Sequence, residues 1–78
     1  MLLDVSILSP KVVIFEGKAS SVILPGEEGV FEVLAFHKRL LSRLISGTLV
    51  IDEKDIPIRR GIVKVEQNKV IIIIEEAL

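Results

Sequence analysis

Turn-forming residues interrupt this chain at intervals of roughly ten positions, and that spacing restricts its possible folds more than any other feature. Ser9-Pro10, Glu16-Gly17, Pro25-Gly26 and Gln67-Asn68 each follow a short apolar segment. The segments between these turns have the length of β-strands. Many short strands with turns between them are typical of a β-sandwich or barrel, so we predict a small all-β domain.

Hydrophobic residues within these segments tend to alternate with polar ones. Leu3, Val5 and Ile7 are separated by polar residues. In 61–66, Val63 and Val65 lie on one face, and Ile62, Lys64 and Glu66 lie on the other. A period of two residues is the signature of a strand with one buried face. Only 40–45 has a spacing compatible with a helix, of one or two turns at most.

Composition supports strands as well. Half of the residues are hydrophobic, yet only three are aromatic and none is Trp or Tyr. The core must therefore be aliphatic and largely β-branched, which favours strands over helices. Pro57 cannot donate a hydrogen bond within a sheet, so 56–58 is predicted to be an edge strand or a strand start. Asn68 is predicted to adopt the left-handed conformation in a tight hairpin turn.

The run from Val70 to Ile74 is apolar on both sides of the expected strand. A half-exposed strand would need only one apolar side. Either the strand is central in the sandwich or a partner covers its second face.

Several classes of protein are excluded by simple counts. The 78 residues allow one domain, 1–78, and the chain has no cysteine and one histidine, so neither a disulfide nor a structural zinc site is expected. A formal net charge of −1 argues against a nucleic-acid binder. No apolar run approaches the ~20 residues that span a bilayer, and the amino terminus lacks the features of a secretory signal, so no direct membrane insertion is expected.

No residue set predicts catalysis or a cofactor. His37 has no cysteine to activate, and the chain has no Gly-rich phosphate loop followed by Lys-Ser or Lys-Thr. Glu27 and Glu28 are interpreted as solvated loop carboxylates. The basic group of His37, Lys38, Arg39 and Arg43 is interpreted as a solvated face or as a docking surface for a protein, because aromatic residues that would stack on bases do not accompany it.

The order of these segments resembles a known family. Three stretches carry the resemblance: 13–17 (Val-Ile-Phe-Glu-Gly), 22–29 (Val-Ile-Leu-Pro-Gly-Glu-Glu-Gly), and 33–41 with its histidine and paired leucines. The final hairpin, 63–70, is similar too. Together they resemble the epsilon subunit of F-type ATP synthases over essentially the whole chain.

This resemblance implies a ten-stranded β-sandwich of short antiparallel strands in a non-catalytic rotor subunit. Such a subunit links the gamma subunit to the membrane rotor ring of c subunits and couples ion translocation to ATP synthesis, at the cytoplasmic face of the bacterial inner membrane. The resemblance places Glu27, Glu28, Gly29, Val30, His37, Lys38 and Arg39 at one ring-facing end of the sandwich. The resemblance also suggests that the gamma subunit contacts a flat face of the sandwich that includes Ile71 and Ile73.

The chain departs from the family pattern at 34–39, where tight proline turns are usual and two cations, Lys38 and Arg39, stand here. The family's carboxy-terminal helical hairpin is not expected, since 75–78 would form barely one helical turn, and inhibition of ATP hydrolysis is not expected either. The alternative interpretation is a stand-alone β-sandwich module that binds another protein.

Overall fold

The computed structural model describes residues 2–75, which form nine β-strands joined by short turns. The strands are β1 (Leu3–Leu8), β2 (Val13–Ala19), β3 (Ser21–Gly26), β4 (Gly29–Leu34), β5 (Leu40–Leu44), β6 (Gly47–Ile51), β7 (Lys54–Ile58), β8 (Gly61–Glu66) and β9 (Lys69–Ile74). The expectation for the tail beyond Glu75 lies outside the described residues.

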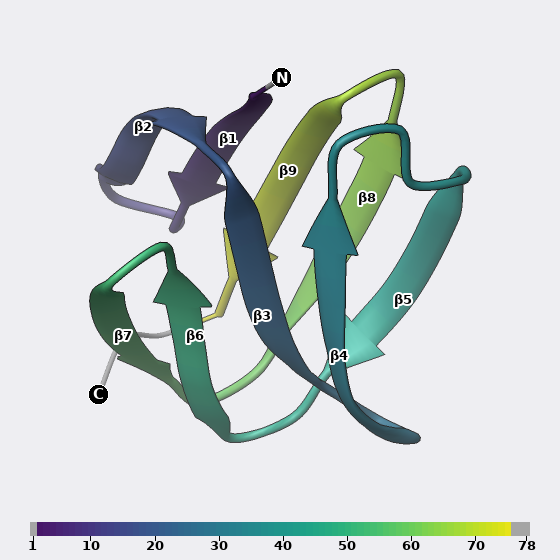
Figure 1. Ribbon diagram of the computed structural model, residues 1–78. Helices are drawn as coiled ribbons and strands as arrows, with labels where there is room; N and C mark the ends of the chain where they lie inside the picture. The colour runs from purple at the N-terminus through teal and green to yellow at the C-terminus, as the bar shows by residue number, and fades with distance from the viewer. Residues whose placement is uncertain (1, 76–78) are drawn as a thin grey trace.

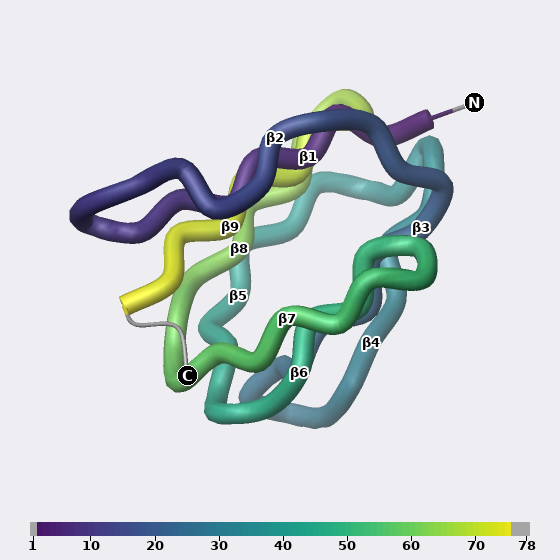
Figure 2. The backbone as a smooth tube through the Cα atoms, turned by 90° about the vertical axis from the view of Figure 1, so that its left-hand side faces the viewer, coloured from purple at the N-terminus to yellow at the C-terminus, as the bar shows by residue number. Residues whose placement is uncertain are grey.

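The strands form two packed layers. Strands β2, β1, β9, β8 and β5 make one layer, and β4, β3, β6 and β7 make the other. Figure 1 shows the second layer in front of the first, and the turned view of Figure 2 separates the two layers. A single bridge, Gly26 opposite Leu44, connects β3 to β5 and makes the two layers one continuous sheet. The all-β sandwich predicted from turn spacing is confirmed.

Four details differ from the expectations. Glu16 and Gly17, expected at a turn, lie within β2, where they pair with Ser6 and Val5 of β1. The described residues contain nine strands and not ten, and their longest connection, 35–39, turns at Phe36 with φ +68°. The strands are not all antiparallel, since β1 and β9 run parallel. The segment with helical spacing is strand β5, because Leu40 and Leu44 face inward and Leu41 and Arg43 face solvent.

The core is aliphatic, as the composition predicts. Sixteen hydrophobic residues are buried within the described part of the chain, and no polar or charged residue there is buried with them. In β8, Val63 and Val65 point inward. In β9, Val70, Ile72 and Ile74 do the same, between neighbours β1 and β8. The two-sided apolar run is therefore a central strand that buries one side and leaves Ile71 and Ile73 on the other.

Two local predictions are confirmed. Pro57 lies in β7, which is the last strand of its layer and so an edge. Gln67 and Asn68 have φ values of +50° and +62°, the pair of left-handed residues that a two-residue hairpin turn requires.

Candidate functional site

A groove runs along the edge of the sandwich between β4 and β5. It has a volume of about 620 Å³. The acidic turn of Glu27 and Glu28, between β3 and β4, lies at one end, and His37 and Lys38, in the loop between β4 and β5, lie at the other. Phe31 and Leu40 contribute apolar surface between these ends.

The loop of His37, Lys38 and Arg39 is fixed by contacts with the end of β8 and with the turn that follows it. The backbone N–H of Phe36 donates to the side-chain oxygen of Asn68 at 2.7 Å, and the Arg39 guanidinium forms an ion pair with Glu66 at 2.8 Å. The His37 Nδ1 lies 2.7 Å from the Lys38 carbonyl oxygen, which can only accept, so Nδ1 carries the proton. These contacts hold the backbone that carries Lys38 and Arg39 in one conformation.

The structure does not bring all seven predicted ring-contact residues to one end. Glu27, Glu28, Gly29 and Val30 lie where β4 begins, whereas His37, Lys38 and Arg39 follow its end. A strand of this length spans about 20 Å, so the two groups are separated by the long side of the sandwich. Figure 1 shows the β3–β4 turn and the β4–β5 connection at opposite ends of β4. The two groups lie along the same groove and not at a common end of the sandwich.

A second surface lies on the outer face of the layer that contains β9. Ile71 and Ile73, predicted for the gamma contact, point outward there and are 39% and 53% exposed. Ile73 is paired with Ile62 of β8 on one side and with Leu8 of β1 on the other. Leu8 is in turn paired with Val13 of β2. An apolar row therefore crosses four strands.

We call this row, Val13–Leu8–Ile73–Ile62, the outer apolar row. Sequence reasoning found Ile73 but missed the contribution of Leu8 and Val13. The alternation in the first strand was recognised, but the pairing of β1 with both β2 and β9 is a long-range property. The outward positions of Ile62 and Ile73 follow from the alternation within their own strands.

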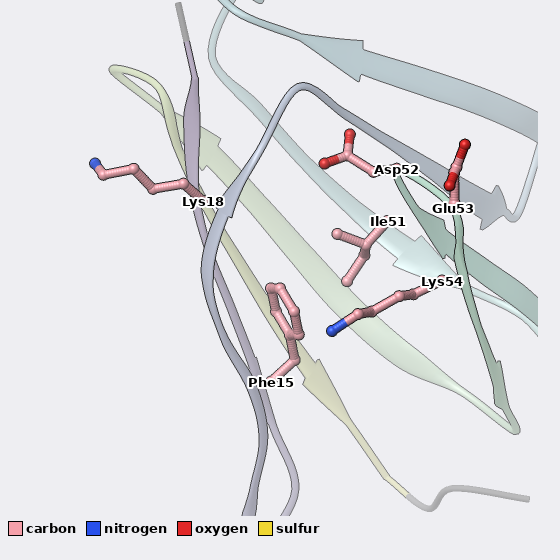
Figure 3. A pocket seen from close by; sticks show the side chains of 6 residues that line it. All are labelled: Phe15, Lys18, Ile51, Asp52, Glu53 and Lys54. Atoms are coloured by element: carbon pink, nitrogen blue, oxygen red, sulfur yellow. The ribbon is translucent and has the colours of Figure 1, made fainter.

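A hollow of about 660 Å³ on the opposite edge was not predicted. It lies between β2 and the turn that joins β6 to β7. Figure 3 shows the Lys54 side chain directed towards Phe15, where its Nζ lies 5.3 Å from the ring centroid, and Lys18 directed away. Lys18 pairs with Asp4 at 2.7 Å, and the Asp52 carboxylate accepts from the N–H groups of Ser20 and Ser21.

These contacts engage three of the four charged side chains that line the hollow, those of Lys18, Asp52 and Lys54, within the protein. Lys18 lowers the pKa of the Asp4 carboxyl, first through its hydrogen bond and then through its charge. The hollow therefore offers little convergent charge to a ligand. Among residues 2–75, no three His, Asp or Glu side chains are placed to hold a metal, and no helix has the length and hydrophobicity required to span a bilayer.

Comparison with known proteins identifies a family over nearly the whole chain. Residues 2–78 match the model of the β-sandwich domain of the ATP synthase delta/epsilon chain. The ATP synthase epsilon chain of Sulfurimonas denitrificans is 43% identical over 97% of this chain, and that of Campylobacter fetus is 37% identical over 97%. The chain spans only 62% and 63% of the length of these two relatives.

Solved structures support the fold. A chain of the Euglena gracilis mitochondrial ATP synthase is similar with a TM-score of 0.88 and 21% identity, over 99% of this chain and 52% of that one. A chain of the Tetrahymena thermophila mitochondrial ATP synthase central stalk and c-ring gives a TM-score of 0.84 and 17% identity, over 97% and 65%. At these low identities, the similarity shows only that the chain shares the β-sandwich fold of these proteins.

Proposed function

The chain belongs to the ATP synthase delta/epsilon chain family, and from this premise we propose that it is the β-sandwich of a central-stalk rotor subunit. In this role it is a structural, non-catalytic part of an F-type ATP synthase. It connects the gamma subunit to the membrane ring of c subunits and so couples ion translocation to ATP synthesis. Its place is peripheral, at the cytoplasmic face of the bacterial inner membrane.

The observation that supports this role best is the outer apolar row. Its members lie side by side on four neighbouring strands, and Val13, Ile62 and Ile73 are each about half exposed. Contiguous exposed apolar surface on a small domain is typical of an interaction site. In the proposal, the gamma subunit covers this row together with Ile71.

The ring contact is proposed for the groove. The carboxylates of Glu27 and Glu28 and the cation of Lys38 are exposed and line the groove, to which Arg43 of β5 adds a second cation. Arg39 is exposed next to Lys38. Such an arrangement suits polar loops of the c subunits that lie along the groove, with Gly29, Val30 and His37 in the same contact. The separation of the two charged groups favours a contact along the side of the sandwich over a contact at one tip.

Rigidity suits a part that transmits torque. The buried aliphatic core spans both layers. Side-chain hydrogen bonds also join segments that are distant in sequence: the Asp52 carboxylate accepts from the Ser21 N–H, and Ser46 Oγ donates to the Arg59 carbonyl oxygen at 2.7 Å. Well-packed cores transmit strain with little compression.

Affinity capture tests the proposal. The tagged chain, expressed in a bacterium whose own epsilon chain has been deleted, should recover gamma, the catalytic-head subunits and the c subunits from mild-detergent extracts. A Val13→Lys, Ile73→Lys double variant should recover none of them, although it remains folded. Recovery of one unrelated protein in place of these subunits would support the alternative, a stand-alone binding module, and would refute the rotor role.

A further inference from the structure

The face that carries the outer apolar row becomes charged towards its other end. The outward side chains change from apolar to charged in the order Ile73, Ile71 and Lys69 on β9, and in the order Ile62, Lys64 and Glu66 on β8. At about 3.4 Å per residue, Lys64 lies roughly 7 Å from Ile62 along β8, and Lys69 lies roughly 14 Å from Ile73 along β9. Lys64 is also the cross-strand neighbour of Ile71. A partner that covers Ile71 therefore meets Lys64 as well.

The nearest carboxylate to Lys64 is engaged by another cation. Glu66 Oε2 lies 2.8 Å from a guanidinium nitrogen of Arg39, whereas Glu66 Oε1 lies 3.9 Å from the Lys64 Nζ. The second distance is beyond hydrogen-bond range. The Lys64 side chain is 58% exposed, and among residues 2–75 its ammonium group has no hydrogen-bond acceptor. Its donors are therefore available to a group from outside the chain.

Lys69 has still less compensation. Its cross-strand neighbours are Asp4 of β1 and Glu66 of β8. Asp4 is paired with Lys18 at 2.7 Å, and Glu66 is paired with Arg39, so each carboxylate has a closer cation. In the part of the chain that the structure describes, no carboxylate forms an ion pair with Lys69, which is exposed.

Cations outnumber carboxylates on the whole outer face of this layer. Its outward cations are Lys18, Arg39, Arg43, Lys64 and Lys69, and its outward carboxylates are Asp4, Glu16 and Glu66. Arg60 and Glu75 at its edge form an ion pair at 2.9 Å and add no net charge. Five cations against three carboxylates leave two positive charges, although the formal net charge of the chain is −1. The face is thus complementary to an acidic surface.

A small hollow separates the two lysines. It has a volume of about 170 Å³ and is lined by Lys64, Glu66, Gln67, Lys69 and Ile71. A hollow of this size admits the end of one side chain and is too small for a strand or a helix. An ammonium group has three donors and no acceptor, so two of them favour a carboxylate, which only accepts. Ile71 provides apolar contact for the methylene groups of the same side chain.

We propose that the gamma subunit places an aspartate or glutamate side chain between Lys64 and Lys69, next to the apolar residues with which it covers Ile71 and the outer apolar row. This inference rests on the proposed function, because it takes gamma as the covering partner. Apolar contact is non-directional, so the row alone does not fix how gamma is turned on the face. A carboxylate roughly 7–14 Å from the row fixes that orientation.

Zero-length chemical coupling tests the contact directly. A water-soluble carbodiimide joins a lysine amine to a carboxylate that touches it, with loss of water. Applied to the complex of the chain with the whole gamma subunit, it should give a peptide in which Lys64 or Lys69 is joined to an Asp or Glu of gamma, identified by mass spectrometry. A Lys64→Arg, Lys69→Arg double variant should keep its affinity for gamma but lose this product, because a guanidinium keeps the charge and is not coupled.

The affinity for gamma tests the charge itself. A Lys64→Gln, Lys69→Gln double variant should bind gamma about tenfold more weakly than the wild type at about 0.05 M salt, and the difference should shrink at about 0.5 M, where exposed charges are screened. Lys54→Gln removes a lysine from β7 of the other layer and should bind gamma as the wild type does. Circular dichroism of the isolated variants checks that each is folded.

The outcomes separate this inference from the rotor role. If wild-type chain binds gamma but neither lysine is coupled to a gamma carboxylate, or if the Gln double variant binds gamma as tightly as the wild type at low salt, the proposed carboxylate contact is wrong and the rotor role stands. If the wild-type chain does not bind gamma at all, both proposals are refuted.

Discussion

The side-chain oxygen of Asn68 accepts a hydrogen bond from the backbone N–H of Phe36 at 2.7 Å, across 32 positions of sequence. The same residue has φ +62°, and its backbone carbonyl accepts from the N–H of Asp4 at 2.8 Å. Asn68 thus joins the turn between β8 and β9 to the loop after β4 and to the start of β1. Asparagine combines the left-handed backbone with a side-chain acceptor.

Two substitutions of Asn68 should separate these roles. Asn68→Gly keeps the left-handed backbone but loses the acceptor, and it should lower the free energy of unfolding by about 1 kcal/mol. Asn68→Ala loses the acceptor and also strains the backbone, so it should cost about 2–3 kcal/mol. Chemical denaturation monitored by circular dichroism measures both. Equal losses in the two variants would show that backbone conformation contributes nothing here.

The alternation of β9 gives a second prediction. Ile72→Ala removes a fully buried side chain and should lower the free energy of unfolding by about 2–5 kcal/mol. Ile73→Ala removes an exposed side chain from the next position and should cost about 1 kcal/mol or less. Thermal unfolding of the isolated chain makes the comparison. Similar losses in both variants would contradict the one-sided burial of this strand.

Local signals in the sequence predicted most of this fold. The turn at Gln67 and Asn68, the edge position of Pro57 and the alternation of Val63 and Val65 all depend on residues within a few positions of one another. Strand β5 was ambiguous for the same reason. A segment of five residues with Leu40, Leu41 and Leu44 satisfies either period, and its pairing with β8 decides the outcome.

The arrangement of the surfaces depended on contacts that are distant in sequence. The parallel pairing of β1 with β9, which aligns Leu8 with Ile73, has no local signature. The two groups of residues predicted for the ring contact were expected together because the resemblance treats them as one region. Their separation follows from the extended conformation of β4 between them, once its length as a strand is fixed.

A third prediction concerns Gly61, at the start of β8. A methyl group there would lie 2.5 Å from the backbone oxygen of Ile73 and 3.2 Å from the Cα of Ile74, so the strands would have to move apart. Gly61→Ala should lower the free energy of unfolding by about 1–3 kcal/mol.

Gly17→Ala is the matched control for that change. Its methyl group would meet only the Phe15 ring, at 3.5 Å, which is ordinary van der Waals contact. The expected change is within about 0.5 kcal/mol. Urea denaturation of both variants tests the pair. A neutral Gly61→Ala would mean that β8 and β9 separate more easily than their close backbone packing indicates.

A fourth prediction concerns the proposed ring contact and its dependence on salt. Lys38→Glu should weaken co-purification with the c subunits, and the wild-type contact should weaken as ionic strength rises, because exposed charges are screened beyond about 10 Å at 0.1 M salt. Lys38 is preferable to Arg39 for this test, since Arg39 is paired with Glu66 and its reversal would disturb the loop.

Lys11→Glu makes the same charge change in the turn between β1 and β2 and should leave recovery of the c subunits as it is. Recovery that is independent of salt and unchanged by Lys38→Glu would remove the basic loop from the ring contact. The remaining candidate along the groove would then be the turn of Glu27 and Glu28.

The last prediction concerns the gamma contact and the outer apolar row. Ile73 lies in the middle of this row, between Leu8 and Ile62, and its side chain is half exposed. A lysine at this position keeps its charge in water when the chain is alone, so Ile73→Lys should change the unfolding temperature little. Under a covering gamma subunit the same charge would lose its hydration and gain no partner of opposite charge, so the affinity for gamma should fall at least about 30-fold, or ~2 kcal/mol.

Thr48→Lys, at an exposed position on the other layer, provides the control and should bind gamma as the wild type does. Titration of purified gamma followed by calorimetry measures all three chains. Equal affinities for wild type and Ile73→Lys would show that gamma binds elsewhere, and the exposed apolar row would then require a different partner.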